Sequence, residues 1–101
     1  MAFQKACKKE EVNENSAKYI ELNGKQIALF NINGNFYAIS NTCLHRGGPL
    51  AEGSIDEEHV ICPLHGWEYD IPSGKCITNP TLTIERFDVK IEGDDILIDT
   101  K

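Results

Sequence analysis

Two short segments each place a cysteine beside a histidine, and these four residues carry the clearest chemistry in the chain. Cys43 and His45 are separated by one residue, and Cys62 and His65 by two. Thiolate sulfur and imidazole nitrogen are common metal ligands. Residues two apart in an extended segment point the same way, so Cys43 and His45 can reach one small bound group. The two pairs therefore predict a metal centre with two sulfur and two nitrogen ligands.

Glycine and proline follow both pairs and would let the backbone come close to that centre. Gly47, Gly48 and Pro49 come after the first pair, and Gly66 comes after the second. A glycine backbone can wrap closely and direct its N–H groups inward. A cofactor with electron-rich sulfides needs such donors, because hydrogen bonds to sulfur help to set its reduction potential.

The segments that must position these pairs have the pattern of antiparallel β-structure. Apolar runs are joined by Asn-Gly dipeptides, which favour tight two-residue hairpins because both turn positions need positive φ. The runs are residues 18–22, 25–32 and 36–40, and the dipeptides are Asn23-Gly24 and Asn33-Gly34.

The C-terminal part continues this pattern. Phe87, Val89 and Ile91 alternate with charged residues, which predicts a half-buried strand that turns back at residues 92–95. Only residues 8–15 suggest a helix, and that segment is too short and polar to bury much. The chain is therefore predicted to be all-β, with a base of antiparallel hairpins closed as a small sandwich or barrel.

Residues 41–80 interrupt the hairpin pattern. Glycine and proline crowd between short strand-like pieces there, which predicts a loop-rich tip carried on the β base. Loops held by a rigid scaffold commonly carry binding chemistry. A length of 101 residues is typical of one domain. We expect a single domain over residues 1–101, with the tip at about 41–80 inserted in the β base.

The charge balance narrows the class of partner. Ten basic and sixteen acidic side chains give a formal net charge of −6, which disfavours nucleic acid and anionic membranes and suits a basic protein. The longest purely apolar run, residues 27–30, is too short to span a membrane. The first ten residues lack the apolar stretch of a secretory signal, so we expect a cytoplasmic protein.

The spacing of the two pairs resembles the ligand pattern of Rieske 2Fe–2S proteins, which is Cys-x-His, sixteen residues, and Cys-x-x-His. The flanking sequences of residues 43–50, 62–70 and 73–75 also match that family. The chain resembles a stand-alone Rieske ferredoxin over nearly its whole length, similar to the ferredoxin component of bacterial ring-hydroxylating dioxygenases.

The resemblance implies a ligand set and a fold. In Rieske proteins both thiolates bind one iron and both imidazoles bind the other. It follows by resemblance that Cys43 and Cys62 hold one iron of a 2Fe–2S cluster, and that His45 and His65 hold the outer iron. The implied fold is a Rieske-like β base with the cluster between two loops at one end. A third loop around residues 78–80 would cover it.

The resemblance also identifies residues that tune the cluster. High-potential Rieske proteins carry an extra cysteine in each ligand loop, and those cysteines form a disulfide, whereas this chain has Gly48 and Leu64 at those positions. A serine of those proteins is replaced by Trp67, and their tyrosine is retained as Tyr69. Because donors to sulfur are lost, we expect a potential in the lower half of the Rieske range of about −150 to +300 mV.

A docking face is expected at the exposed edge of the histidines. Leu44, Pro49, Pro63 and Leu64 would ring this edge, and Pro80 of the third loop is assigned to the same surface. Electrons would leave and enter the protein there.

The function implied is that of a soluble, monomeric one-electron carrier. It would pass electrons from a flavin-dependent ferredoxin reductase to a terminal oxygenase or similar acceptor, as an electron-transfer component rather than a catalyst on its own. The chain itself is not expected to be the terminal oxygenase, which needs a further iron held by two histidines and a carboxylate, since residues 66–101 contain no histidine.

Two other functions stay open. One is a tightly bound electron-transfer subunit of a larger oxidoreductase. The other is a non-catalytic module that senses redox state or iron, or binds zinc, although zinc sites usually group Cys with Cys and His with His. Outside the two pairs, Cys7 and Cys76 are expected to be ordinary unreactive thiols, and His59 an exposed strand residue.

Overall fold

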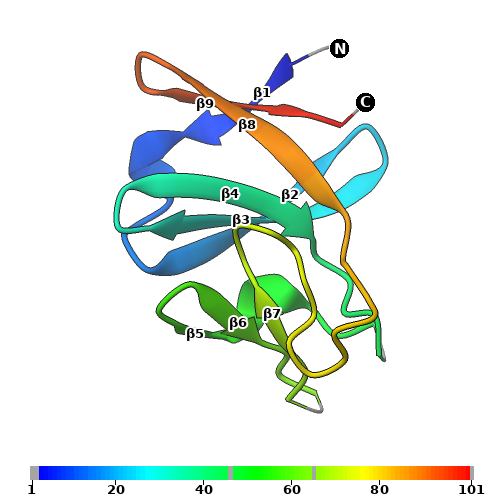
Figure 1. The fold of residues 1–101 in the computed structure, drawn as a ribbon. Coiled ribbons are helices and arrows are strands. Elements are labelled where there is room, and N and C mark those ends of the chain that lie inside the picture. Colours follow the sequence, from blue (N-terminus) through cyan, green and yellow to red (C-terminus); the bar gives the residue numbers. More distant parts are fainter. Residues whose placement is uncertain (1–2, 46, 65, 101) are drawn as a thin grey trace.

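Two antiparallel sheets build the protein in a computed structural model that describes residues 3–45, 47–64 and 66–100 (Figure 1). The larger sheet has the strand order β1-β9-β8-β4-β3-β2, and the smaller has the order β5-β6-β7. The strands are β1 (Phe3–Lys8), β2 (Ser16–Leu22), β3 (Lys25–Ile32), β4 (Asn35–Ser40), β5 (Ser54–Asp56), β6 (His59–Ile61), β7 (Glu68–Asp70), β8 (Arg86–Glu92) and β9 (Asp95–Asp99). Single 3₁₀ turns, η1 (Lys9–Glu11) and η2 (Leu50–Glu52), complete the regular structure of the described residues.

The predicted meander of β2, β3 and β4 is confirmed, and its two turns have the expected backbone. Asn23 and Gly24 adopt φ values of 53° and 78°, and Asn33 and Gly34 adopt 53° and 89°. Both turns have positive φ at both central positions, which is the conformation of a tight hairpin whose twist matches that of the strands. The all-β prediction and the loop-rich tip between β4 and β8 are confirmed as well.

The β8–β9 hairpin is also confirmed, but one expectation for β8 is wrong. Phe87 is buried and Val89 is half-buried, whereas Ile91 is 40% exposed. β8 pairs with β4 only at Phe87 and Arg86 and then continues beside β9 alone. Ile91, at the end of β8 beyond the strand pairing with β4, is therefore more exposed than Phe87.

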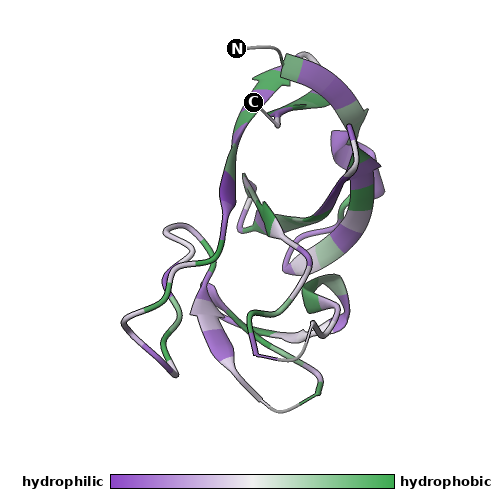
Figure 2. Ribbon diagram, turned by 90° about the vertical axis from the view of Figure 1, so that its right-hand side faces the viewer, coloured by the Kyte–Doolittle hydropathy of each residue, from purple (hydrophilic) through white to green (hydrophobic). Residues whose placement is uncertain are grey.

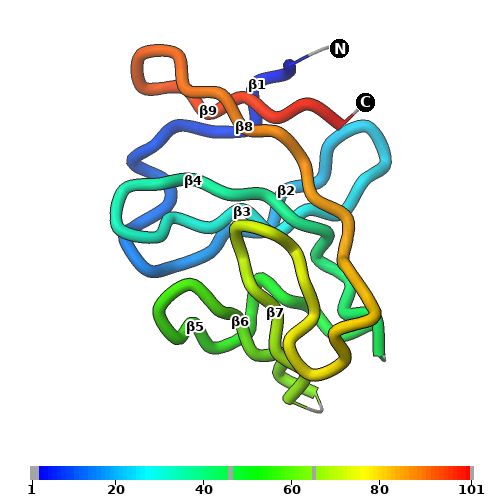
Figure 3. Tube along the Cα trace, viewed as in Figure 1, coloured from blue at the N-terminus to red at the C-terminus, as the bar shows by residue number. Residues whose placement is uncertain are grey.

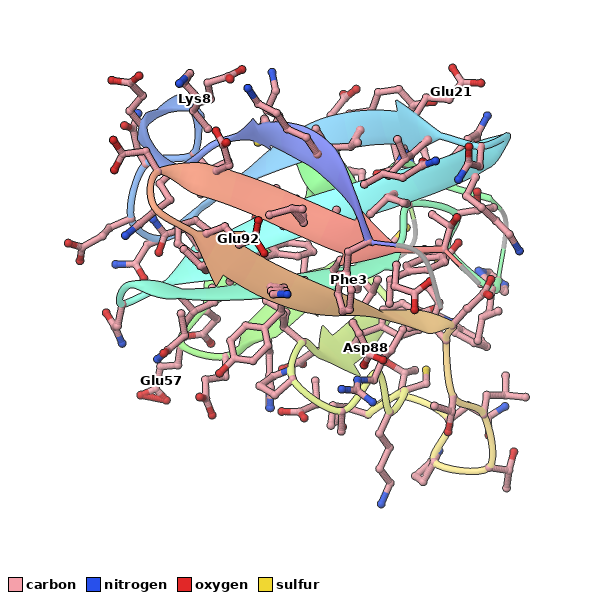
Figure 4. The ribbon with its side chains drawn as sticks, turned by 90° about the horizontal axis from the view of Figure 1, so that it is seen from above. Phe3, Lys8, Glu21, Glu57, Asp88 and Glu92 are labelled. Atoms are coloured by element: carbon pink, nitrogen blue, oxygen red, sulfur yellow. The ribbon has the colours of Figure 1, made fainter. Side chains whose placement is uncertain are left out.

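The N-terminal segment was not predicted as a strand. β1 pairs with β9 from Phe3↔Asp99 to Lys8↔Asp95, so the two ends of the chain lie side by side. The helix suspected at residues 8–15 is limited to the 3₁₀ turn η1. The charged side chains of Lys8, Glu21 and Glu57 project outward from the periphery of the molecule in Figure 4.

Strand β3 separates two hydrophobic cores. Ile27 and Leu29 pack in a core within the curled six-stranded sheet, and Ala28, Phe30 and Ile32 pack in a second core against the tip. Alternate residues of a strand point to opposite faces, so the continuous apolar run at 27–30 is buried on both sides. Figure 2 shows the curl of the larger sheet and the smaller sheet below it.

In the part of the chain that the structure describes, no helix has the length and apolar character needed to cross a membrane.

The glycine that follows β7 gives a test of this architecture. Gly74 and Gly24 share a φ of +78°, but a Cβ at Gly74 would lie 2.7 Å from the Ile84 carbonyl oxygen, whereas one at Gly24 meets nothing within 4 Å. We expect Gly24→Ala to cost about 1 kcal/mol through backbone strain. Gly74→Ala should cost about 1–3 kcal/mol more through the added clash. Urea unfolding at a common m-value measures both, and equal costs would show that the Ile84 contact is unimportant.

Candidate metal centre

Three segments of the tip meet at the end of the molecule opposite the termini (Figures 1 and 3). We call them the first loop (residues 43–48, after β4), the second loop (residues 62–67, between β6 and β7) and the third loop (residues 77–82, after β7). Both Cys-His pairs of the sequence prediction fall in the first two loops. Arg46 and His65 lie outside the described residues.

The first loop is a closed turn that begins at Cys43. The Cys43 N–H donates to the Gly48 carbonyl oxygen over 2.9 Å, and the Gly47 N–H donates back to the Cys43 carbonyl oxygen over 2.8 Å. Gly47 has a φ of 71°, a conformation that a side chain would strain. The glycine therefore allows the chain to turn tightly around the cysteine.

The second loop repeats this turn. The Cys62 N–H donates to the carbonyl oxygen of Trp67, five residues on, over 2.7 Å. The N–H of Gly66, four residues on, donates to the Cys62 carbonyl oxygen over 3.1 Å, and Gly66 has a φ of 77°. Both cysteines thus stand at the same position of the same turn, with a positive-φ glycine four residues later.

The two cysteines are buried, and the sulfur of Cys62 lies against Gly48 of the first loop. Cys43 and Cys62 are 2% and 3% exposed and belong to one buried cluster. A Cβ placed on Gly48 would lie 2.7 Å from Cys62 Sγ and 3.0 Å from Leu64 Cγ. Glycine at position 48 therefore lets the two loops approach with these side chains where they are.

Tyr69 connects the smaller sheet to the first loop. Its hydroxyl oxygen accepts the Leu44 N–H over 2.9 Å and lies 3.3 Å from Cys43 Sγ. Burial raises the pKa of Tyr69 far above the ordinary value for tyrosine, and the hydrogen bond to Cys43 raises it further. The phenol therefore stays protonated, and its hydroxyl hydrogen is available to a deprotonated sulfur at Cys43.

His45 and Trp67 form a stacked pair between the first and second loops. Their ring centroids lie 4.6 Å apart at an interplanar angle of 10°. His45 is exposed and Trp67 is half-buried. Sequence analysis placed Trp67 near the cluster but did not predict this contact, because spacing does not indicate which ring of one loop meets the other.

The expected docking residues surround this end of the molecule. Leu44 and Leu64 are 45% and 53% exposed, Pro63 and Pro80 are exposed, and Pro49 is half-buried. Two further exposed apolar residues, Ile77 and Leu82, bound the third loop and were not predicted. Sequence analysis had little indication of them, because a single apolar residue at each end of a polar, proline-containing segment does not form a recognisable pattern.

The third loop is tied to β7 rather than left free. The Ile77 N–H donates to the Glu68 carbonyl oxygen over 2.7 Å, and the Glu68 N–H donates to Thr78 Oγ1 over 2.8 Å. Cys76, at its base, is fully buried and accepts the Asn79 N–H at 3.4 Å. That this loop covers the cluster stays a prediction.

Cys7 is buried in the β base, where burial raises the pKa of its thiol above the ordinary value, with a further rise from the nearby Glu11 carboxylate. A raised pKa lowers the thiolate population, which fits the expected unreactive thiol.

His59 is a strand residue, as predicted, but it is half-buried rather than exposed. Its Nδ1 lies 2.6 Å from Glu68 Oε2, and its Nε2 lies 3.5 Å from Asp70 Oδ1. β6 is the central strand of the smaller sheet, so side chains of the neighbouring strands cover it.

The family to which this site belongs is shown by comparison with known proteins. The family model for the Rieske [2Fe-2S] domain matches residues 2–90 of the chain. The chain therefore belongs to the Rieske [2Fe-2S] domain family, and its cofactor is a 2Fe–2S cluster.

Its relatives are ferredoxins of dioxygenase systems. The ferredoxin component of the naphthalene 1,2-dioxygenase system of Pseudomonas aeruginosa is 32% identical over 90 residues, which cover 88% of this chain and 86% of that protein. The ferredoxin of carbazole 1,9a-dioxygenase from Nocardioides aromaticivorans has the same fold, with a TM-score of 0.92 over 100% of both chains and 23% identity.

The fold also matches a chain in the complex of reduced oxygenase and oxidized ferredoxin in carbazole 1,9a-dioxygenase. The TM-score is 0.88 at 22% identity, over 95% of this chain and 91% of that chain.

The described residues fit such a cluster. Two buried sulfurs lie on the inner side, and the His45 imidazole lies on the exposed side. A bare backbone at Gly48 leaves space beside Cys62 Sγ, and a phenol hydroxyl reaches Cys43 Sγ. Soft sulfur and imidazole donors are the ligand set of Rieske centres.

Removing the phenol hydroxyl should lower the reduction potential. A hydrogen bond to sulfur stabilises the more negative reduced state, so Tyr69→Phe is expected to shift the midpoint downward by about 40 mV, the equivalent of roughly 1 kcal/mol for one electron. Redox titration followed by EPR measures the shift, with the half-buried Tyr37→Phe as the matched control. A rise in potential would contradict the role assigned to the hydroxyl.

Proposed function

We propose that this protein is a one-electron carrier that passes electrons from a flavin-dependent ferredoxin reductase to a terminal oxygenase. The observation that carries the proposal is the contrast between the two kinds of site residue: the cysteines are buried, whereas His45 is exposed and the three loops also expose apolar side chains. A carrier needs this arrangement, because its partner must come close to the cluster without displacing the residues that hold it. The similarity to dioxygenase ferredoxins supports the same function.

Four side chains would hold the cluster. Cys43 and Cys62 bind one iron, and His45 and His65 bind the other. The cluster supplies a site that takes up and releases a single electron. The closed turns fix the two cysteines, Gly48 allows the loops to meet, and Tyr69 donates a hydrogen bond to Cys43 Sγ.

The partner binds at what we call the apolar rim, which consists of Leu44, Leu64, Ile77 and Leu82. These side chains are exposed. The matched fold in a complex of oxygenase and ferredoxin supports a terminal oxygenase as one partner. The net charge of −6 favours partner surfaces with basic residues. We place the protein in the cytoplasm, as a monomer and a single domain whose tip, at about 41–80, carries the site.

The ligand set is tested by substitution of each pair. His45→Ala and Cys62→Ala should abolish the Rieske EPR signal and visible spectrum, because a missing ligand opens the cluster to loss. Cys76→Ser and Cys7→Ser should keep both, since these buried thiols are not assigned to the cluster. Loss of the signal in the Cys76 variant would show that the ligand set is wrong.

The apolar rim is tested by charge insertion. Leu44→Glu and Leu64→Glu should leave the spectrum unchanged but slow electron transfer to a ring-hydroxylating oxygenase by roughly tenfold, because each buries a charge at the interface. Stopped-flow reoxidation of the reduced protein measures the rate. Ile91→Glu is the matched control, since Ile91 has similar exposure on β8. Equal slowing by the Ile91 variant would place docking elsewhere.

Gel filtration distinguishes this carrier from a permanently bound subunit of a larger oxidoreductase. The protein purified from its own cells would co-elute with a larger oxidoreductase on gel filtration at moderate salt, whereas a carrier would elute alone.

A further inference from the structure

We propose that Trp67 is a positioning residue that ties the first and second loops together by stacking on His45. This inference rests on the proposed function, because it takes His45 as a cluster ligand. The stacked pair has a centroid separation of 4.6 Å and an angle of 10°. Aromatic rings in proteins attract one another at such distances when they are offset. The indole therefore restricts rotation of the exposed His45 imidazole.

The place of Trp67 in the turn of the second loop explains why its ring reaches His45. Trp67 accepts the N–H of Cys62 through its carbonyl oxygen, just as Gly48 accepts the N–H of Cys43. The two residues occupy equivalent positions, and each lies against the opposite loop. Gly48 lies against the side chain of Cys62, and Trp67 lies against the side chain of His45. The loops thus contact each other at both equivalent positions, one through a bare backbone and one through a large ring.

No disulfide connects the loops in this chain. All four cysteines are free of disulfides. Gly48 and Leu64, where other Rieske proteins carry a disulfide, are adjacent, since a Cβ on Gly48 would lie 3.0 Å from Leu64 Cγ. Apart from the cluster itself, non-covalent contacts between the loops therefore help to hold the cysteine and histidine side chains in place.

The other non-covalent contacts described above hold the two cysteines rather than the histidine. Tyr69 holds Leu44 and the Cys43 sulfur, and Gly48 packs on Cys62. On the histidine side, the His45 ring stacks on Trp67. Loss of the indole should leave the contacts of Cys43 and Cys62 intact and make the orientation of the His45 ring less fixed.

Iron release from the holoprotein tests this role without any oxygenase. Trp67→Leu keeps apolar bulk but removes the ring, so we expect chelator-driven loss of the cluster to become roughly three- to tenfold faster under anaerobic conditions. Trp67→Phe keeps a ring that can stack, so it should restore a rate within about twofold of wild type. The EPR signal of reduced Trp67→Leu should also broaden, because the orientation of His45 becomes variable.

One control separates this inference from general destabilisation, and a second variant of Trp67 serves as a reserve. Phe3→Leu removes another half-buried aromatic residue, in β1 at the end of the molecule opposite the loops (Figure 1), and should leave the release rate unchanged. Trp67→Met provides the same test with a flexible side chain if the leucine variant does not fold.

Equal rates in wild type, Trp67→Leu and Trp67→Met would overturn the positioning role, and so would equal acceleration by Trp67→Phe and Trp67→Leu. Retention of the Rieske signal in His45→Ala would instead refute the ligand set on which the proposed function depends.

Discussion

Burial of strand β3 on both faces is the constraint on which the rest of the structure depends. One face supplies Ile27 and Leu29 to the core of the curled sheet, and the other supplies Phe30 and Ile32 to the core that contains both site cysteines. The tip therefore rests on a strand that cannot shift without disrupting the base. Positions of the cysteine sulfurs are set by packing that extends across the molecule, and the loops add only the local turns.

The same hydrogen-bonded turn follows each site cysteine, although the spacing from cysteine to histidine differs between the two loops. The histidine follows its cysteine after one residue in the first loop and after two in the second, yet both cysteines begin a turn closed by a glycine four residues later. The symmetric part is the backbone around the sulfurs. The asymmetric part is the contact five residues after each cysteine, where Gly48 admits the other loop and Trp67 covers it.

Local signals accounted for most of what sequence analysis predicted. Asn-Gly dipeptides determine both turns of the meander because few other residues accept positive φ twice in succession. Contacts between distant segments were not predictable in this way. Nothing in residues 3–8 indicates that they pair with β9, and the paired carboxylates that cover His59 come from the neighbouring strand β7. The stack of His45 on Trp67 was likewise missed, since it depends on how two turns approach each other in space.

The pairing of β1 with β9 has a consequence for how this domain can be joined to other polypeptides. Phe3 lies opposite Asp99, so the chain enters and leaves at neighbouring points, and Figures 1 and 2 place both ends away from the tip. A tether at either end would leave the apolar rim free to approach a partner. The same topology can thus serve as a diffusing protein or as a module inserted between two segments of a longer chain, with no rearrangement of its interior.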